Sequence, residues 1–244
     1  MLPEINLQGD LDVAVLSPLL RGMLLSLAYA DGEGGIGLTA TGAMNRKFVH
    51  WAAVHFLWPG YTHDELFSVN KVLNESDMPP LWAVRDFLHF SRFTRRRKDK
   101  LLPTKRGLEF LAKPDSFFDQ IAAEYLYSYV HYRMDREGVL ARMPWWHVFL
   151  NVINIQARNG CTPDDLMAIL HPNAIPGTID AVERKMEISY DILRPLCWLG
   201  LMREDRDGLT ILQDGTYYKT PLWNACLTLE SDNQKEFISI NRLH

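Results

Sequence analysis

The amino-acid sequence predicts a mainly α-helical protein with short β-hairpins, built from two similar units that a long helix joins. Two observations lead to this fold class. Apolar residues recur at helical spacing behind capping residues along most of the chain. Two separated stretches also share one order of elements, in which helices precede a charged hairpin. The chain has 244 residues, enough for two domains, and its 47% hydrophobic residues suit a packed core.

Helix boundaries are clearest in the first half of the chain. Ser17 and Pro18 can begin one helix, and Thr62 with Glu65 has the spacing of a capping box. Thr39 or Thr41 is expected to cap the helix between them. The elements predicted for this half are a short strand at 36–38, a hairpin at 94–103, and helices over about 17–30, 41–58, 62–74, 81–93 and 105–112.

The second half is predicted to begin with a long aromatic helix over about 117–136, capped by Asp115. On this helix Tyr125, Tyr129 and Tyr132 share one face and should pack in a core or an interface. Pro195 should kink or end a later helix over 178–198. The other predicted elements are helices at 145–159 and 162–170, a hairpin at 200–210 with its turn at Asp207-Gly208, and a strand-like piece at 237–240.

These elements suggest a division of the chain into five parts. Lys113-Pro114-Asp115 is a plausible end of the first unit, and Pro144 precedes the second. The predicted parts are a loosely held N-terminal arm at 1–12, a first unit at 13–113, a linking helix and loop at 114–144, a second unit at 145–223 and a polar C-terminal tail at 224–244.

The two predicted units follow one order of elements, three helices and a charged hairpin. The first ends in Leu101-Leu102-Pro103-Thr104-Lys105-Arg106-Gly107, and the second in Leu209-Thr210-Ile211-Leu212-Gln213-Asp214-Gly215. A three-helix core closed by a β-hairpin is the arrangement of a winged helix-turn-helix. The sequence therefore predicts tandem winged helix-turn-helix-like units. The stretch 199–205 also resembles the passage from helix to wing in many bacterial winged-helix regulators.

A larger part of the chain resembles a family of uncharacterised bacterial proteins with winged-helix-like repeats. The similar stretches span most of residues 16–223 and lie at 38–42, 45–53, 69–75, 149–154, 193–198 and 219–223. They are also distantly similar to the C-terminal helical part of a plasmid-encoded open-reading-frame family. This resemblance implies a bacterial origin and brings no activity with it.

A dense cluster of positive charge lies at the first predicted hairpin. Between residues 92 and 106, eight basic residues stand against Asp99 alone, a net charge of +7 in a chain of net charge −4. Such a cluster can neutralise the phosphates of DNA, while the helix before it could enter a groove. Phe93 could stack on a base or anchor the hairpin. The predicted DNA-binding residues are Arg92, Arg95, Arg96, Arg97, Lys98, Lys100, Lys105 and Arg106, with Arg46 and Lys47 near a helix start.

A charged loop paired with acidic residues of the same chain is the competing interpretation of this cluster. The two interpretations differ in whether the fold neutralises the hairpin charge. The second unit has a mixed charge on its helix before the hairpin, carried by Asp180, Glu183, Arg184, Lys185, Glu187 and Asp191. That unit therefore suits a protein partner better than DNA, and the long aromatic helix could form a homodimer seam. A non-catalytic adaptor protein is the alternative function.

Other classes of function find little support in the residue patterns. The sequence has no G-x-S-x-G, Walker A, G-x-G-x-x-G or H-E-x-x-H motif, so we expect neither an enzyme nor a cofactor or metal site. His50 and His55 are spaced to lie on different helix faces. The three cysteines, Cys161, Cys197 and Cys226, are far apart and indicate a reducing compartment. With no predicted membrane span, we expect a soluble cytoplasmic protein.

Overall fold

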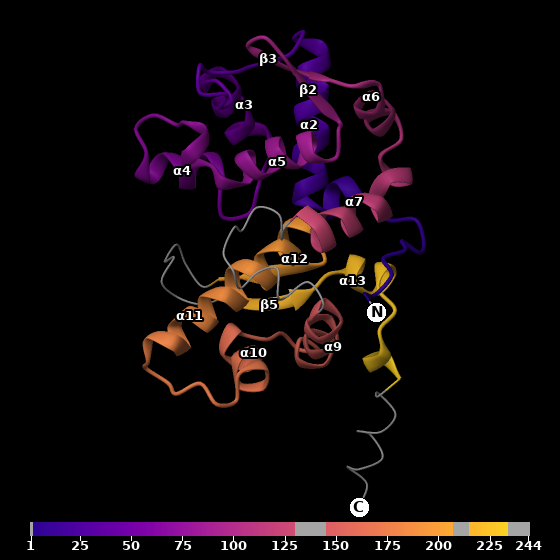
Figure 1. The fold of residues 1–244 in the computed structure, drawn as a ribbon, viewed down its shortest axis with the longest axis vertical. Coiled ribbons are helices and arrows are strands. Elements are labelled where there is room, and N and C mark those ends of the chain that lie inside the picture. The colour runs from indigo at the N-terminus through magenta and orange to yellow at the C-terminus, as the bar shows by residue number, and fades with distance from the viewer. Residues whose placement is uncertain (1, 130–144, 207–214, 234–244) are drawn as a thin grey trace, which may run out of the picture. The chain divides into compact units, whose positions relative to one another are not determined.

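The computed structural model describes residues 2–129, 145–206 and 215–233 (Figure 1). The chain is mainly helical and has small antiparallel sheets of two and three strands. It divides into two compact units. The N-terminal unit is Asp12–Glu124, and the C-terminal unit combines Met1–Leu11 with Tyr125–His244.

The N-terminal unit is built around α2 (Pro18–Gly32), which follows the short α1 (Val13–Leu16). The predicted start of this helix is confirmed, because the Ser17 hydroxyl accepts the N–H of Leu20 at 3.2 Å and Pro18 takes the first helical position. Its apolar residues, among them Leu19, Leu20, Met23 and Leu27, are fully buried. The helix packs against α5 (Pro79–Phe90), β3 (Lys100–Pro103) and α6 (Lys105–Ala112).

The next helix, α3 (Arg46–His55), starts later than the sequence predicts. Its cap is Asn45, whose side chain accepts the N–H of Phe48 at 3.0 Å, and neither Thr39 nor Thr41 caps it. The prediction failed because residues 39–43 form a turn of their own, in which the Thr39 hydroxyl accepts the N–H of Ala43 at 3.1 Å. Before this turn lies the predicted short strand, β1 (Ile36–Gly37).

Two further helix boundaries differ from those predicted. The capping box of Thr62 and Glu65 is present at the start of α4 (His63–Val69), but this helix does not reach residue 74. It stops where Asn70 turns extended and its side-chain amide donates to the Leu66 carbonyl at 3.0 Å. A short 3-10 helix, η1 (Glu75–Asp77), then leads to α5, which begins at its two prolines rather than at Leu81.

The predicted hairpin at 94–103 is confirmed as β2 (Thr94–Arg97) and β3. Strand β3 lies in the middle of a three-stranded antiparallel sheet of order β1-β3-β2. Thr104 caps α6 by accepting the N–H of Gly107 at 3.1 Å. The unit closes with η2 (Pro114–Phe117) and α7 (Phe118–Glu124), so Asp115 lies inside a 3-10 turn instead of capping a helix.

After residues 1–11, the C-terminal unit resumes with a π-helical segment, η3 (Tyr125–Tyr129), in which Tyr125 and Tyr129 are buried and stacked with ring centroids 5.8 Å apart. Tyr132 and the rest of the predicted long helix lie outside the described residues. The helices that follow are α9 (Trp146–Gln156), α10 (Pro163–Leu170), α11 (Ile179–Glu187), α12 (Arg194–Leu199) and α13 (Pro221–Cys226), with the 3-10 helix η6 (Glu230–Asp232).

Pro195 does not end its helix. The turns before it widen into a π-helical segment, η5 (Ile188–Leu193), and the helix continues through α12 to Gly200 at φ 89°. Proline has no N–H to donate, and its ring clashes with the carbonyl four residues earlier in a regular α-helix. A wider turn accommodates both effects.

The second hairpin uses a later partner strand than the sequence predicts. Strand β4 (Met202–Asp205) pairs with β5 (Thr216–Lys219), with Asp205 opposite Thr216. The predicted turn at 207–208 and the strand-like piece at 237–240 lie outside the described residues. Part of the predicted arm and part of the predicted tail are held together: Ile5 bridges Leu227, and both are buried.

Both hairpins are attached to their preceding helices by the same hydrogen bonds. Arg92 (φ 59°) in the N-terminal unit and Gly200 in the C-terminal unit each donate to the carbonyl three residues earlier, both at 3.0 Å. The next residues, Phe93 and Leu201, each donate to the carbonyl five residues earlier, both at 2.9 Å. This is the Schellman arrangement, in which the left-handed residue is usually glycine.

The far ends of the two hairpins also correspond. Thr104 and Thr220 donate through their N–H groups to the carbonyls of Phe93 and Leu201 at 2.9 and 3.0 Å, and through their hydroxyls to those of Arg92 and Gly200 at 2.8 and 2.6 Å. Each threonine then caps the following helix, α6 or α13. The repeat therefore has a different register from the predicted one, since Thr220 rather than Thr210 corresponds to Thr104.

Candidate nucleic-acid interface

The hairpin that carries the basic cluster is fixed to the core at its base. Phe93 is fully buried and contacts the rings of Phe110 and Phe117, with centroids 4.8 and 5.9 Å away. Phe93 therefore anchors the hairpin and is not exposed for stacking. Gly107 lies so close to the Phe93 carbonyl oxygen that a Cβ atom there would clash with it. These contacts hold β2 and β3 in one position on the unit.

The tip of the hairpin is a two-residue turn, Lys98-Asp99, because Arg97 pairs directly with Lys100. Lys98 has a left-handed backbone (φ 56°), which is uncommon for a residue with a Cβ atom. The Asp99 carbonyl accepts the N–H of Leu38 at 2.6 Å. The tip is therefore tied to the chain just beyond β1, although it is exposed.

The alternation of side chains along the strands divides the cations between two faces. Arg95 and Arg97 share one face of β2, and the cross-strand partner of Arg97 on this face is Lys100. We call Arg95, Arg97 and Lys100 the basic face. Directly opposed like charges are destabilising in a sheet. The Arg97–Lys100 pair therefore does not stabilise the hairpin.

The other face carries Arg96 beside the buried Leu101. The Arg96 guanidinium bends back over the tip, where its Nε donates to the Lys98 carbonyl at 3.1 Å. Its Nη1 also approaches Gly42 in the turn before α3. Arg96 thus connects the hairpin tip to that turn.

Most of the basic cluster has no carboxylate partner in the described part of the chain. Within residues 2–129, 145–206 and 215–233, no ion pair involves Arg92, Arg95, Arg97, Lys98 or Lys105, and all five are exposed. Lys100 donates to the Gly34 carbonyl at 3.0 Å, which leaves its charge uncompensated. The fold does not neutralise the hairpin charge with the acids of the described chain.

Arg106 differs from the other predicted binding residues. Its guanidinium lies over the rings of Phe93 and Phe117, 5.0 and 5.6 Å from their centroids, and it is half-buried. Such a cation–π contact stabilises the packing of α6 against the hairpin base. Arg106 is therefore mainly a structural residue.

Arg46 and Lys47 are brought close to the hairpin tip by the short strand β1. Gly37 of β1 pairs with Lys100 and also contacts the Asn45 side chain that caps α3. Arg46 donates from Nε to Asn74 at 3.0 Å. Lys47 forms an exposed ion pair with Glu33 at 3.1 Å, and this hydrogen-bonded carboxylate raises the pKa of Lys47.

The helix before the basic hairpin, α5, is poorly suited to reading bases in a groove. Its exposed side chains in the structure are Trp82, His89 and Phe90. Its only arginine, Arg85, is 18% exposed and bonded to Glu75 at 2.5 Å and to Asp86 at 3.3 Å. The expectation that this helix enters a groove is therefore not supported by the side chains it exposes.

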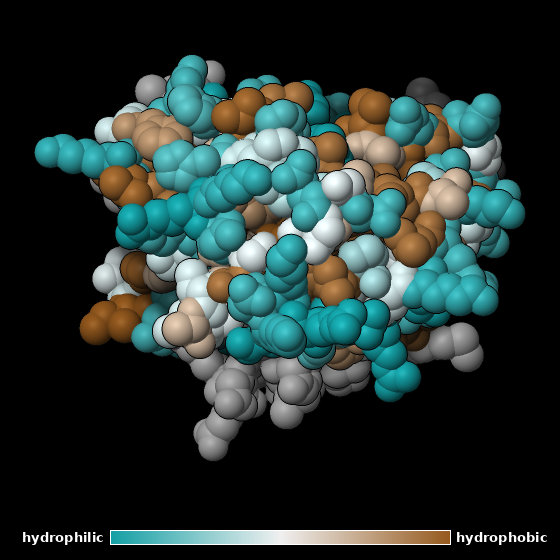
Figure 2. All heavy atoms as spheres, turned by 90° about the horizontal axis from the view of Figure 1, so that it is seen from above, coloured by the Kyte–Doolittle hydropathy of each residue, from teal (hydrophilic) through white to brown (hydrophobic). Residues whose placement is uncertain are grey.

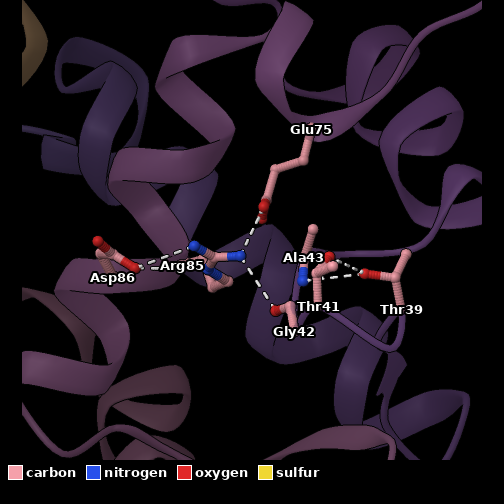
Figure 3. A network of polar contacts seen from close by, with 7 residues as sticks. All are labelled: Thr39, Thr41, Gly42, Ala43, Glu75, Arg85 and Asp86. Atoms are coloured by element: carbon pink, nitrogen blue, oxygen red, sulfur yellow. Dashed lines mark hydrogen bonds and ion pairs between the residues drawn. The ribbon is translucent and has the colours of Figure 1, made fainter.

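Arg85 instead organises a buried polar network (Figure 3). Besides the two carboxylates it donates to the Gly42 carbonyl at 3.1 Å, and so holds the turn at 39–43 that Arg96 approaches. Glu75 is only 5% exposed; burial raises its pKa, and the Arg85 charge opposes that effect. No pattern in the sequence signals this network, because Gly42 lies 43 residues from Arg85.

The equivalent hairpin of the C-terminal unit is neutralised by its own residues. Arg203 pairs with Asp205 at 3.5 Å, and Arg206 pairs with Glu204 at 2.7 Å. Glu204 also accepts the Tyr217 hydroxyl at 2.7 Å. The two hairpins thus share their attachment to the helix but differ in charge, as the sequence predicts.

The described residues contain neither a metal-binding cluster nor a helix that could span a membrane. In that part of the chain, no group of three or more His, Cys, Asp or Glu side chains is placed to hold a metal ion. No helix in the same residues is long and apolar enough to cross a membrane. The three cysteines are free thiols, and Cys161 and Cys226 are buried.

Comparison with known proteins places both parts of the chain in one family. Residues 15–116 match the family model described as the Y4jL N-terminal domain, and residues 135–221 match the y4jL C-terminal domain. A protein of Sinorhizobium fredii (strain NBRC 101917 / NGR234), named "Uncharacterized protein y4jL", is 64% identical over 173 residues, which are 71% of this chain and 79% of that protein. No solved structure matches the chain. The chain therefore belongs to the y4jL family of bacterial proteins and contains its N-terminal and C-terminal domains.

Proposed function

We propose that this protein binds DNA through the basic face of its N-terminal hairpin. The observation that carries the proposal is a set of exposed cations, on a hairpin held at its base and tip, that have no carboxylate partner among the residues the structure describes. Cations of this kind bind backbone phosphates and release counterions, which supplies affinity but little sequence specificity. Arg95, Arg97 and Lys100 make the main phosphate contacts, with Arg92, Lys98 and Lys105 beside them.

Each unit is, in this proposal, a winged helix-turn-helix-like module whose hairpin is the wing. The order of elements supports it, since in both units helices precede a hairpin that is attached by the same hydrogen bonds. The wing rather than α5 carries the free positive charge of the N-terminal unit. The expected binding is therefore dominated by phosphates rather than by base edges.

The charge of the chain favours a local contact over general coating of DNA. The N-terminal unit has 14 basic and 13 acidic residues, a net charge of +1, and the C-terminal unit has a net charge of −5. Only the hairpin region is strongly positive. A polyanion is therefore expected to bind there and to be repelled elsewhere.

A non-catalytic adaptor remains the second candidate function, and one observation favours it for the C-terminal unit. The helix α11 buries only Ala181 and exposes Ile179, Val182 and Met186 by 80%, 55% and 51%. These three residues recur at helical spacing and form an apolar stripe of the kind found at protein interfaces. A protein partner or a second copy of the chain would bind there, independently of DNA at the hairpin.

The test is the binding of a labelled random DNA duplex at low salt, measured by fluorescence anisotropy. The variant Arg95→Gln/Arg97→Gln should bind about tenfold more weakly or worse, because two phosphate contacts are lost. The control Lys71→Gln/Lys113→Gln removes the same charge from exposed positions of the same unit and should change affinity little. Equal losses in both variants, or no binding by the unmodified protein, would contradict the proposal.

A further inference from the structure

A pocket of about 530 Å³ opens beside the basic hairpin, within the N-terminal unit. It is lined by Ala28, Tyr29, Gly32, Glu33, Lys47 and Trp51, which come from α2, from the residue that follows it and from α3. Its volume lies in the range of small-molecule sites. Figure 2 shows hydrophobic patches set among hydrophilic residues on the face that it views.

The pocket and the basic face are joined through two consecutive residues, Glu33 and Gly34. Lys100 reaches the Gly34 carbonyl from the hairpin at 3.0 Å, and Lys47 reaches the Glu33 carboxylate from α3 at 3.1 Å. A path of cations therefore runs from Arg97 and Lys100 to Lys47 at the mouth of the pocket. A strand of nucleic acid on the basic face would be led to this pocket.

One wall of the pocket is aromatic and well fixed. The Trp51 ring lies 4.7 Å from the Tyr29 ring and is stacked on His55 at 4.4 Å between centroids. Both Tyr29 and Trp51 also contact Phe48, which is fully buried. An aromatic wall beside a cationic path is the combination that single-strand-binding proteins use to hold bases.

The acid at the mouth of the pocket indicates which part of a nucleotide would bind there. Glu33 would repel a phosphate, but a carboxylate accepts hydrogen bonds from the exocyclic amino group of a base such as cytosine. Its side chain is 53% exposed, so a ligand can reach it. Lys47, which is 73% exposed, can leave Glu33 for a neighbouring phosphate.

We propose that the pocket holds an unpaired base with an exocyclic amino group, from single-stranded nucleic acid that follows the basic face. Glu33 accepts the amino group, Tyr29 and Trp51 contact the base, and Lys47 binds a flanking phosphate. This inference rests on the proposed function, because the hairpin supplies the affinity that brings the strand to the pocket.

The test compares single-stranded oligonucleotides of about 12 nucleotides, all cytosine or all thymine, by fluorescence anisotropy at pH 7.5. Thymine has no amino group, so the full-length protein should bind the cytosine strand about three- to fivefold more tightly. Glu33→Met, which removes the acceptor of the amino group, should abolish this preference by weakening cytosine binding. Ala28→Leu leaves the charge unchanged and narrows the pocket from its exposed wall. This variant should also weaken binding of the cytosine strand.

The outcomes separate this inference from the proposed function. If Glu33→Met tightens binding of both strands equally, Glu33 acts only by repelling phosphate and the pocket proposal is wrong. Equal binding of the two strands by the unmodified protein would also overturn it. In either case a loss of all binding in Arg95→Gln/Arg97→Gln would leave the hairpin function standing. If the unmodified protein binds neither strand nor duplex DNA, both proposals fail.

Discussion

Replacing Arg85 by Met should strongly destabilise the N-terminal unit, because it leaves a buried carboxylate without its main cation. Glu75 is 5% exposed and Arg85 is 18% exposed, so water can do little to replace the lost partner. Breaking a buried ion pair by removing one member costs about 3–5 kcal/mol. The lost hydrogen bond to the Gly42 carbonyl contributes about 1 kcal/mol more to the loss of stability.

The loss of stability in Arg85→Met should depend on pH in a defined direction. Burial already raises the pKa of Glu75 above its ordinary value of 4.5, and removal of Arg85 raises it further. The folded variant then binds a proton more tightly than the unfolded chain does. Its free energy of unfolding should therefore be lowest above the folded-state pKa of Glu75 and should recover as the pH falls towards 4.5.

Urea unfolding followed by tryptophan fluorescence at pH 7.5 and pH 5.5 measures both effects. The double variant Arg85→Met/Glu75→Gln is the control, since its neutral amide should recover much of the stability and remove the added pH dependence. An Arg85→Met protein that loses less than about 1 kcal/mol, below the range for breaking a buried pair, would refute the reasoning. The same loss at both pH values would refute it too.

Three further predictions follow from the hairpin and the cysteines. Thr104→Ala and Thr220→Ala should each lower the free energy of unfolding of their own unit by about 1–2 kcal/mol, since each removes a helix cap and a hydrogen bond from the hydroxyl. Unaltered midpoints in urea unfolding would contradict the equivalent roles of the two threonines. Lys98→Gly should raise the stability by about 0.5–1 kcal/mol by relieving the left-handed backbone; a lowered melting temperature would speak against this. Burial raises the pKa of the Cys161 thiol to about 11. At pH 8 this thiol should therefore react with a thiol reagent only after unfolding. Labelling of Cys161 in the native protein, measured by mass spectrometry, would be inconsistent with that burial.

Local signals in the sequence predicted the parts of the fold that depend on neighbouring residues. The capping box at Thr62, the start of α2 at Ser17 and the hairpin at 94–103 all appear as expected. Each depends on a hydrogen bond or a turn formed within a few residues. The cap of α3 was missed because Thr39 and Thr41 were already used in a turn that brings Asn45 to the helix start.

Features that depend on distant residues could not be predicted in this way. The bond from Arg85 to Gly42 spans 43 residues, and the Lys47–Glu33 pair spans 14. The basic cluster was visible as a run of charge, but its lack of carboxylate partners among the described residues follows only from the fold. The correspondence of Thr104 with Thr220 was also hidden, because the second hairpin has a longer connection between its strands.

The salt dependence of DNA binding tests the central claim most directly. Each phosphate neutralised on duplex DNA contributes about −0.9 to the slope of log affinity against log salt concentration. If Arg95 and Arg97 each neutralise one phosphate, Arg95→Gln/Arg97→Gln should reduce the magnitude of that slope by about 1.8 relative to the unmodified protein. Lys71→Gln/Lys113→Gln should leave the slope unchanged. Equal slopes for the hairpin variant and the unmodified protein would show that the basic face does not contact the phosphates.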